Sequence, residues 1–360
     1  SSTGATVRDN LISGKTVGVY STSDDTTVDH NTIEEGAYGV YFYNCHDGSV
    51  YYNTFRNNSY GIRLYMSPSS TSSHTISNNK ILYTDWALEL VNAHGNMFTG
   101  NWLQQNTYGI YMASSSSNTV YRNNFVNNNM QTYSGTGTGN AWDRNISGKR
   151  QGNYWSDYTG VDEDPRDGIG DTPYRIIPVG YDNYPLMTTW SEHDIAIQNV
   201  TISTHETHPG PMVNITVTVE NNANISVSET FTVTTNYGLN IIETEAVVDL
   251  APGEGTTLVF NWNTTDVVPG NYTISAEASV VSDELNTDNN NFIDGSIYVI
   301  IPGDVNIDGT INNDDLTLLI AAYGSTPTSP HWNSDADLNK DNVIDALDLS
   351  TLCENYGKTA

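Results

Sequence analysis

The amino-acid sequence predicts a mostly β chain made of three consecutive parts. These are a right-handed parallel β-helix with a C-terminal cap, an immunoglobulin-like β-sandwich and a small α-helical module. Three observations predict this order: an Asn-centred repeat runs through the first 130 residues, alternating apolar strands fill the middle, and two acidic loops, each followed by a short apolar helix, occupy the last sixty. The boundaries are expected at 1–189, with the cap at about 131–187, then at 190–300 and 301–360.

The composition limits the partners of this 360-residue chain. Asp and Glu number 42 but Lys and Arg only 13, which gives a formal net charge of −29. Nucleic-acid binding needs clustered cations, so no nucleic-acid partner is expected. No apolar run approaches 18 residues, so no membrane span is expected either. Cys45 and Cys353 are expected to be free thiols, with a bond between different protomers as the alternative.

The first part repeats an apolar residue, two residues of any kind, Asn, one residue of any kind and another apolar residue. The steps between successive Asn residues are 21, 22, 26, 22 and 22, and these residues are Asn10, Asn31, Asn53, Asn79, Asn101 and Asn123. A coil of this length with short strands and a recurrent turn Asn is typical of a right-handed parallel β-helix. The Asn amides are expected to stack from coil to coil.

A second pattern of the same period places aromatic residues in a row on the outside of the coils. The row, read at the position before a recurrent Gly or Ala, contains Tyr38, Tyr60, Trp86 and Tyr108. Exposed aromatic side chains favour a surface that binds sugar or protein. The alternative is that the rings only stack on one another. Arg63 and Glu89 fall on adjacent coils and are expected to form an ion pair.

The end of the β-helix carries a specific motif. From Gly152 the sequence reads GNYWSDYTGVDEDPRDGIGDTPYRIIP, followed by DNYPLM at 182–187. Together with the Asn repeat, it resembles the NosD-type β-helix proteins, described as periplasmic copper-binding, over about residues 7 to 187. Copper prefers clustered His, Met or Cys. The sequence does not favour copper, because the candidates share no register on adjacent coils: His30, His46, His74, His94, Met66, Met97, Met112 and Met130.

The cap contains a loop rich in carboxylates. Asp162, Asp164, Asp167 and Asp171 surround two glycines, Gly168 and Gly170. Closely spaced Asp with Gly at sharp bends suits a hard cation, so one further calcium ion is a candidate here. The alternative is a solvated acidic turn.

The middle part reads as a β-sandwich. Seven short alternating strands are expected between about 194 and 299, which suits an immunoglobulin-like sandwich. The piece LNTDNNNF at 285–292 resembles the adhesion-related CARDB domains. Asn-x-Ser/Thr glycosylation sequences are dense enough to favour an extracellular glycoprotein, and they occur at Asn57, Asn145, Asn199, Asn214, Asn224, Asn263 and Asn271.

The last part contains two twelve-residue acidic loops that start 33 residues apart. Positions 1, 3, 5, 7 and 12 of the first loop are Asp304, Asn306, Asp308, Thr310 and Asp315, and those of the second are Asp337, Asn339, Asp341, Val343 and Asp348. Position 6 is Gly309 in the first loop and Asn342 in the second, and both residue types accept a left-handed backbone. This EF-hand-like arrangement predicts two calcium ions. Short helices are expected at 316–323 and 347–356.

Two such loops, each followed by one helix, resemble a type I dockerin over residues 303 to 358, and the segment at 327–333 looks like the archaeal form. The resemblance implies a cohesin module as the partner. Dockerin recognition often uses loop positions 10 and 11, which are Asn313 and Asp314 in the first loop and Ala346 and Leu347 in the second. Because the two halves differ, a symmetric dual binding mode is not expected.

These features favour an extracellular structural or adhesive glycoprotein. Head-to-tail assembly into a fibre or surface layer is expected, because the first coil exposes Val7, Ile12 and unpaired strand backbone. Either the calcium-dependent dockerin-like module or the sandwich of another copy could cover this edge. The competing interpretation is that a preceding segment caps this edge. The alternative function is a dockerin-tethered protein that binds or cleaves cell-surface polysaccharide. No catalytic residue is predicted, because paired carboxylates for glycoside cleavage are not found on one strand face.

Overall fold

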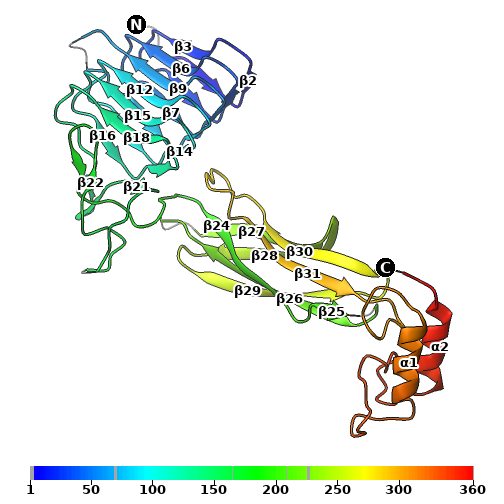
Figure 1. The fold of residues 1–360 in the computed structure, drawn as a ribbon. Helices are drawn as coiled ribbons and strands as arrows, with labels where there is room; N and C mark the ends of the chain where they lie inside the picture. Colours follow the sequence, from blue (N-terminus) through cyan, green and yellow to red (C-terminus); the bar gives the residue numbers. More distant parts are fainter. Residues whose placement is uncertain (1–3, 69–70, 164, 208, 225–227, 360) are drawn as a thin grey trace. The chain divides into compact units, whose positions relative to one another are not determined.

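We analysed a computed structural model of the chain, which describes residues 4–68, 71–163, 165–207, 209–224 and 228–359. The chain divides into two compact units, Ser1–His193 with Ala223–Ile225, and Asp194–Asn222 with Ser226–Ala360. The predicted fold class is confirmed: a parallel β-helix of about six coils is followed by a β-sandwich and then by two short helices (Figure 1).

Each coil of the β-helix contributes one strand to each of three parallel sheets. The first sheet consists of β1 (Thr6–Arg8), β4 (Thr27–Asp29), β7 (Ser49–Tyr51), β10 (Thr75–Ser77), β13 (Met97–Thr99) and β16 (Thr119–Tyr121). The second consists of β2 (Leu11–Ser13), β5 (Thr32–Glu34), β8 (Thr54–Arg56), β11 (Lys80–Leu82), β14 (Trp102–Gln104), β17 (Asn124–Val126) and β21 (Tyr154–Trp155). The third consists of β3 (Val17–Ser21), β6 (Tyr38–Tyr43), β9 (Tyr60–Tyr65), β12 (Trp86–Val91), β15 (Tyr108–Ala113) and β18 (Met130–Ser134).

The apolar repeat positions fill the interior of the coils. Each strand of the first two sheets turns its middle residue inward, and most of these side chains are fully buried, among them Val28, Val50, Ile76, Phe98 and Val120. The recurrent Gly has a steric cause: a Cβ on Gly39 would meet the backbone oxygen of Gly61 on the next coil and the ring of Phe55 inside. The coils therefore approach closely at this corner, where no large side chain fits.

The cap closes the far end of the β-helix core with aromatic rings. Trp155 stacks on Phe125 at 4.3 Å and on Tyr174 at 4.3 Å between ring centroids. The cap also contains two antiparallel hairpins, β19 (Arg144–Ile146) with β20 (Lys149–Gln151), and β22 (Tyr174–Arg175) with β23 (Tyr181–Asp182). The rest of the cap between these strands is irregular.

The sandwich has a three-stranded and a five-stranded sheet. The first contains β24 (Ile195–Ile202), β26 (Met212–Asn221) and β29 (Gly255–Asn263), and the second contains β25 (Glu206–Thr207), β31 (Asn291–Val299), β30 (Gly270–Ala278), β27 (Glu229–Tyr237) and β28 (Asn240–Leu250). The seven predicted strands are all present, and the short β25 is additional. The LNTDNNNF segment is anchored to the start of β24 through Glu284, the residue before it. The Glu284 carboxylate accepts hydrogen bonds from the Ile195 and Val281 N–H groups and from the Asn290 side chain.

The C-terminal module contains α1 (Asn313–Ala322) and α2 (Ala346–Asn355), packed on a core that includes Ile311, Ile344 and Leu352. Both helices begin before the predicted starts of 316 and 347, inside the acidic loops. The reason is a capping box at each start: the position-12 carboxylate, Asp315 or Asp348, accepts the N–H of the N-cap residue. The last residue of each loop thus also caps the first turn of the helix that follows it.

Candidate functional site

The first acidic loop is held by hydrogen bonds from its own backbone to its carboxylates. Asp304 Oδ2 accepts the N–H of Gly309 at 2.8 Å, and Asp315 Oδ1 accepts the N–H groups of Val305 and Asn306 at 2.8 and 3.1 Å. Gly309 has φ 83°, in the left-handed region where a residue with a side chain is strained. The loop therefore wraps around the side chains of positions 1 and 12.

The second loop repeats these contacts. Asp337 Oδ2 accepts the N–H of Asn342 at 3.0 Å, and Asp348 Oδ1 accepts the N–H groups of Leu338 and Asn339 at 2.7 and 3.2 Å. Asn342 has φ 68°, so this Asn adopts the left-handed backbone that was predicted for position 6. The two halves share one local design despite their different sequences.

The carboxylates at positions 1 and 12 of both loops are buried. Asp304, Asp315, Asp337 and Asp348 are at most 3% exposed. Burial raises the pKa of Asp304, against the lowering effect of its hydrogen bonds from Gly309 and Asp308, because a carboxylate charge costs free energy when it leaves water. No lysine or arginine forms an ion pair with these four groups among the described residues.

Buried oxygen ligands of this kind fit a hard cation such as Ca²⁺. In each loop Asn306 or Asn339 and Asp308 or Asp341 supply further side-chain oxygens, and Thr310 or Val343 would contribute a backbone oxygen. The described part of the chain contains no group of three or more His, Cys, Asp or Glu arranged to hold a metal ion. The ten predicted ligands therefore stay a prediction, supported by their burial and by the repeated hydrogen-bond pattern.

Backbone hydrogen bonds join the two halves of the C-terminal module. Ile311 of the first loop exchanges backbone hydrogen bonds with the segment after α2, through Gly357 and Lys358, and Ile344 of the second loop does so with Gly324 and Ser325 after α1. Each loop is thus fixed by the end of the other half. Among the described residues, this reciprocal pairing links the two loops in one folding unit.

The predicted recognition positions differ in availability. Asn313 accepts a hydrogen bond from the Tyr356 hydroxyl at 2.8 Å, so part of its side chain is used inside the module. Leu347 in the other half is 61% exposed at the start of α2. Ile320 on α1 is 58% exposed. Each half of the module therefore exposes an apolar side chain, but Ile320 and Leu347 do not occupy equivalent positions in the two halves.

The acidic loop of the cap uses its carboxylates differently. Asp162 accepts the N–H groups of Asp167 and Gly168 at 3.1 and 2.8 Å, and Asp171 accepts the N–H of Glu163 at 2.9 Å. Asp164 lies outside the described residues. Asp167 and Asp171 are exposed, and Asp162 is half-buried. The solvated acidic turn is the interpretation that their exposure favours, and the third calcium ion stays a prediction.

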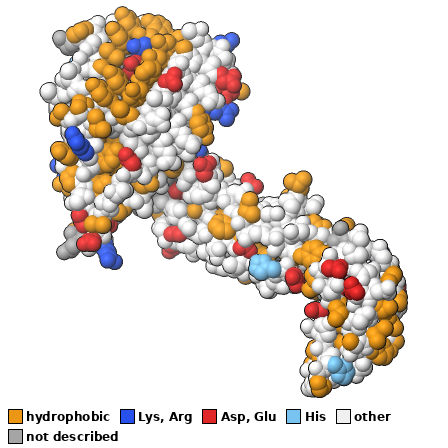
Figure 2. Space-filling view, viewed as in Figure 1, with side chains coloured by type: hydrophobic (Ala, Val, Ile, Leu, Met, Phe, Trp, Pro, Cys, Tyr) orange, Lys and Arg blue, Asp and Glu red, His pale blue; other side chains and the backbone are white. Residues whose placement is uncertain are grey.

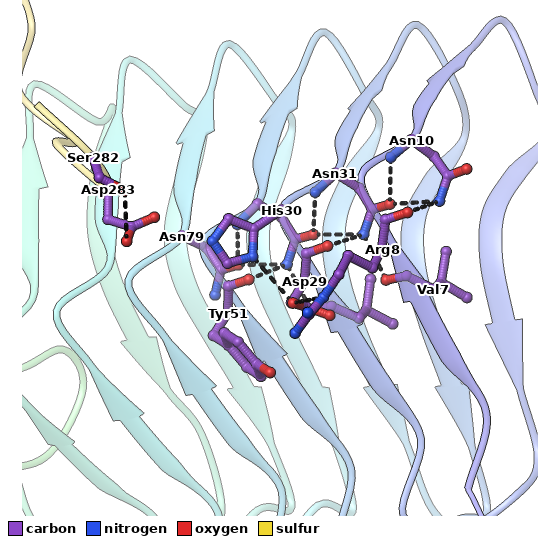
Figure 3. Close-up of polar contacts among 12 residues, drawn as sticks. Val7, Arg8, Asn10, Asp29, His30, Asn31, Tyr51, Asn79, Ser282 and Asp283 are labelled. Carbon is purple, nitrogen blue, oxygen red and sulfur yellow. Dashed lines mark hydrogen bonds and ion pairs between the residues drawn. The ribbon is translucent and has the colours of Figure 1, made fainter. Parts of the chain in front are cut away.

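The repeat Asn side chains form a continuous ladder inside the β-helix. Each side-chain oxygen accepts the backbone N–H and the amide N–H of the Asn one coil earlier; for Asn31 accepting from Asn10 the distances are 3.0 and 2.9 Å (Figure 3). The ladder runs through all six predicted residues and continues to Asn153, which accepts from Asn123 at 3.1 and 2.9 Å. The sequence pattern missed Asn153 because the last step is 30 residues rather than 22.

Asp182 terminates the ladder. Its Oδ2 accepts the N–H of Asn153 at 2.7 Å and the indole N–H of Trp155 at 2.9 Å, and its Oδ1 accepts the N–H of Tyr184 at 3.0 Å. A last rung needs acceptors only, because no further coil follows, and a carboxylate offers acceptors without a donor. Burial raises the pKa of Asp182 to about 6. In the sequence, Asp182 stands out only as the first residue of the DNYPLM motif, and its role as the last acceptor of the ladder is visible only in the structure.

The aromatic row forms one stack along the third sheet. Tyr38, Tyr60, Trp86 and Tyr108 lie 4.8, 4.8 and 5.6 Å apart between ring centroids, with interplanar angles of 13°, 9° and 3°. Figure 2 shows the resulting hydrophobic band on this face of the β-helix, interrupted by charged side chains. Because each ring covers the face of its neighbour, a sugar could reach only ring edges and the two ends of the stack. The structure supports the stacking interpretation, and a binding role stays a prediction.

The predicted ion pair in this surface is confirmed. Arg63 Nε lies 2.6 Å from Glu89 Oε2, and both side chains are less than one-fifth exposed. The Arg63 guanidinium also lies 5.0 Å from the centroid of the Tyr60 ring. The pair is thus integrated into the aromatic face, and burial raises the pKa of Glu89 against the lowering effect of Arg63.

The remaining predicted residues lie as follows. All seven asparagines of the glycosylation sequences are exposed, and the hydroxyl of Thr265 already donates to Asn263 Oδ1 at 2.6 Å within one of them. Val7 and Ile12 are only partly buried, and they pack against the β-helix core at the first coil. Both cysteines are free, Cys45 buried and Cys353 exposed.

The histidines considered for copper have separate partners in the fold. His46 contacts Asp24 at 3.1 Å, His94 Nδ1 accepts the N–H of Ser116 at 3.0 Å, and His74 Nδ1 accepts the N–H of Gly48 at 2.9 Å. His30 contacts Asp29. Each of these imidazoles is thus engaged within its own coil or with the neighbouring coil.

No helix in the described residues is long and apolar enough to span a membrane. Three family models match the chain: the periplasmic copper-binding protein (NosD) family at residues 1–160, CARDB at 192–294 and the dockerin type I domain at 302–355. A search of curated proteins found no match.

Similar solved structures cover the middle of the chain. A CARDB domain from Pyrococcus furiosus, solved in complex with di-metal ions, is 26% identical, covers 31% of this chain and 93% of its own, and has a TM-score of 0.27. A domain from Methanosarcina acetivorans, described as belonging to a cell surface protein, is 20% identical, covers 30% and 92%, and has a TM-score of 0.25. From the family matches and the fold together, the chain consists of a NosD-type β-helix domain, a CARDB domain and a type I dockerin domain.

Proposed function

We propose that the chain is a cell-surface or secreted adhesive protein whose dockerin domain docks on a cohesin module in a calcium-dependent manner. Domains of these types suggest a cell-surface or secreted protein, and type I dockerins generally bind calcium. The observation that carries the proposal is the repeated loop: in both halves the carboxylates of positions 1 and 12 are buried and wrapped by backbone N–H groups.

Calcium would supply the counter-charge that these loops lack. Each twelve-residue loop contains three Asp side chains at ligand positions, for example Asp304, Asp308 and Asp315, and like charges within one short loop repel each other. The module has a small core, so it has little to offset that repulsion. Buried position-1 and position-12 oxygens would hold the ion, while the position-6 backbone makes the sharp turn.

The docking proposal is tested by isothermal titration calorimetry of the whole chain against a panel of cohesin modules. Binding is expected with millimolar Ca²⁺ and is expected to vanish in excess EGTA. Leu347→Glu should weaken binding at least tenfold, because it places a charge on an exposed apolar side chain at a recognition position. Asp335→Ala, an exposed change elsewhere in the module, is the matched control. Binding that is equally strong in EGTA would contradict the proposal.

A structural rather than catalytic role of the β-helix is part of this proposal. Arg63 and Glu89, the charged pair on the aromatic face, neutralise each other and are surrounded by rings. The test is incubation of the purified chain with uronic-acid and neutral polysaccharides, followed by reducing-end analysis. Turnover of any of these substrates would replace this role by that of a dockerin-tethered polysaccharide-cleaving enzyme.

Head-to-tail assembly is the second candidate, favoured by the edge of the first coil. Among the residues that the structure describes, β1, β2 and β3 each lie at the end of their sheet, and Leu11 of β2 is 72% exposed. Such an edge can pair with another chain. Multi-angle light scattering of the native mature protein with millimolar Ca²⁺ tests it: growing oligomers would support assembly, and a monodisperse monomer at high concentration would end it.

A further inference from the structure

The cap of the β-helix contains a small, partly open cavity of about 190 Å³. Its lining combines two cations and one carboxylate with apolar and hydroxyl or amide side chains: Arg122, Lys149, Asp167, Gln151, Ile169, Thr188 and Trp190. Six of the chain's 13 Lys and Arg residues lie between positions 122 and 175. In a chain of net charge −29, two of these six cations, Arg122 and Lys149, line the same cavity.

Arg122 is the unusual member of this lining. Its guanidinium lies 5.1 Å from the centroid of the Trp190 ring, and its Nε donates to the neutral amide oxygen of Gln151 at 2.6 Å. No carboxylate forms an ion pair with it among the residues that the structure describes, although Glu192 is near enough to contribute electrostatically. Burial lowers the pKa of Arg122, as expected for a half-buried cation without a full counter-charge.

The other charges at the cavity already have partners. Lys149 donates to the backbone oxygen of Asp167 at 2.6 Å, and its Nζ lies 3.6 Å from the Asp167 carboxylate. The positive charge left over is therefore that of Arg122. With the ring of Trp190 and the amide of Gln151 fixing its plane, its two Nη groups remain available, and a planar guanidinium held in this way suits a carboxylate.

We propose that this cavity binds one carboxylate-bearing sugar residue, a uronic acid, of an acidic glycan, with Arg122 on the carboxylate. The apolar wall of Ile169, Leu186 and the Trp190 edge suits the C–H face of a sugar ring, and Gln151, Thr188 and Thr189 can hydrogen-bond its hydroxyl groups. The volume is smaller than the roughly 300 Å³ at which sites for drug-sized ligands begin, so it suits a single ring. This site is independent of the dockerin and does not rest on the docking proposal.

The chemistry of the lining favours a sugar over a simple anion. A free phosphate or sulfate would gain from more N–H donors and would gain nothing from an apolar wall. Asn224, one of the glycosylation asparagines, also borders the cavity. Binding is therefore measured on whole chain made in a host without N-glycosylation, so that an attached glycan cannot fill the site.

The test is saturation-transfer NMR and titration with glucuronate and galacturonate, alone and as short oligomers. Saturable binding is expected, and the methyl ester of the same sugar and glucose should bind at least tenfold more weakly, because each lacks the charge. Arg122→Gln should weaken uronate binding at least tenfold. Arg175→Gln, an exposed cap arginine outside this cavity, is the matched control and should leave binding unchanged.

The ligand comparison stands even if Arg122→Gln fails to fold, because it uses only the natural chain. Equal binding of uronate and its methyl ester would overturn the proposal. So would inorganic phosphate that displaces uronate at equal concentration, since that would indicate a general anion site. Loss of cohesin docking in the same preparation would leave this result untouched, so the two proposals fail separately.

Discussion

The β-helix and the dockerin domain both repeat buried polar side chains, but the hydrogen-bonding groups and charges of these side chains find their partners in different ways. In the β-helix the unit is a neutral amide, and the oxygen of Asn79 accepts both N–H groups that Asn53 offers from the coil before it. In the dockerin domain the unit is a set of carboxylates wrapped by backbone N–H groups. An amide ladder is complete in itself, whereas under the proposed function the buried carboxylates of the dockerin loops take their counter-charge from a bound calcium ion.

The comparison extends to how each region ends. The ladder stops at Asp182, a single buried acceptor that closes the row of donors. The dockerin halves have no such stop and close on each other, through Ile311 and Ile344. We therefore expect the stability of the β-helix to depend on a few internal residues, and that of the dockerin domain to depend on solution conditions.

Calcium removal should separate the two regions most strongly. Excess EGTA is expected to unfold residues 303–358 completely while the β-helix stays folded, because the buried dockerin carboxylates lack a protein counter-charge and the neutral Asn ladder needs none. Hydrogen exchange followed by mass spectrometry on the whole chain measures both regions at once. Amides of α1 and α2 should lose their protection, and those of β8, β11 and β14 should keep it. Protected dockerin helices in EGTA would refute the comparison.

Removing the end of the ladder should damage the β-helix alone. Asp182→Ala leaves the buried donors of Asn153, Trp155 and Tyr184 without an acceptor, which we expect to cost about 4 kcal/mol of the free energy of unfolding. Urea unfolding followed by circular dichroism measures it. The matched control is Asp85→Ala, an exposed aspartate of the same β-helix, expected within about 0.5 kcal/mol of the natural chain. Equal stability of the two variants would contradict the role of Asp182 as the final acceptor of the Asn ladder.

The same carboxylate predicts a pH dependence of the β-helix. Its pKa is about 6 in the folded chain, above the ordinary value of 3.8 for aspartate, so the folded state holds a proton that the unfolded state releases. The free energy of unfolding should therefore fall by about 2 kcal/mol as the pH rises from 4 to 6. The measurement is the difference in urea unfolding between the natural chain and Asp182→Asn across this range. A constant difference would contradict the assignment.

The smallest expected effect lies in the second dockerin loop. Asn342 stands at position 6 with φ 68°, a conformation that costs an ordinary side chain about 1 kcal/mol or more. Asn342→Ala should lower the thermal midpoint of the calcium-loaded dockerin accordingly, and Asn342→Gly should preserve or raise it. Calorimetry in millimolar Ca²⁺ checks the pair. If Ala and Gly behaved alike, backbone conformation would not explain the difference between the two loops.

Much of the architecture could be predicted because its signals are periodic and local. The steps between Asn10 and Asn123 identified the coils, and the spacing of Asp304, Asp308 and Asp315 identified the loop. The starts of both helices were placed too late, since nothing in the spacing shows that position 12 also caps a helix. Asn153 and Asp182 were not recognised as ladder residues because the cap interrupts the period.

The sequence by itself determined the repeats, because a stacked coil or a calcium loop imposes the same side chain at a fixed interval. Only the tertiary structure decided which residues meet across long and irregular separations. It joined Asp182 to Asn153, placed Arg122 beside Trp190 with no ion-paired carboxylate among the described residues, and placed the faces of the aromatic row against one another. Such contacts depend on the path by which a loop returns to the core. That path is determined by burial and hydrogen bonding throughout the domain, which no local sequence pattern encodes.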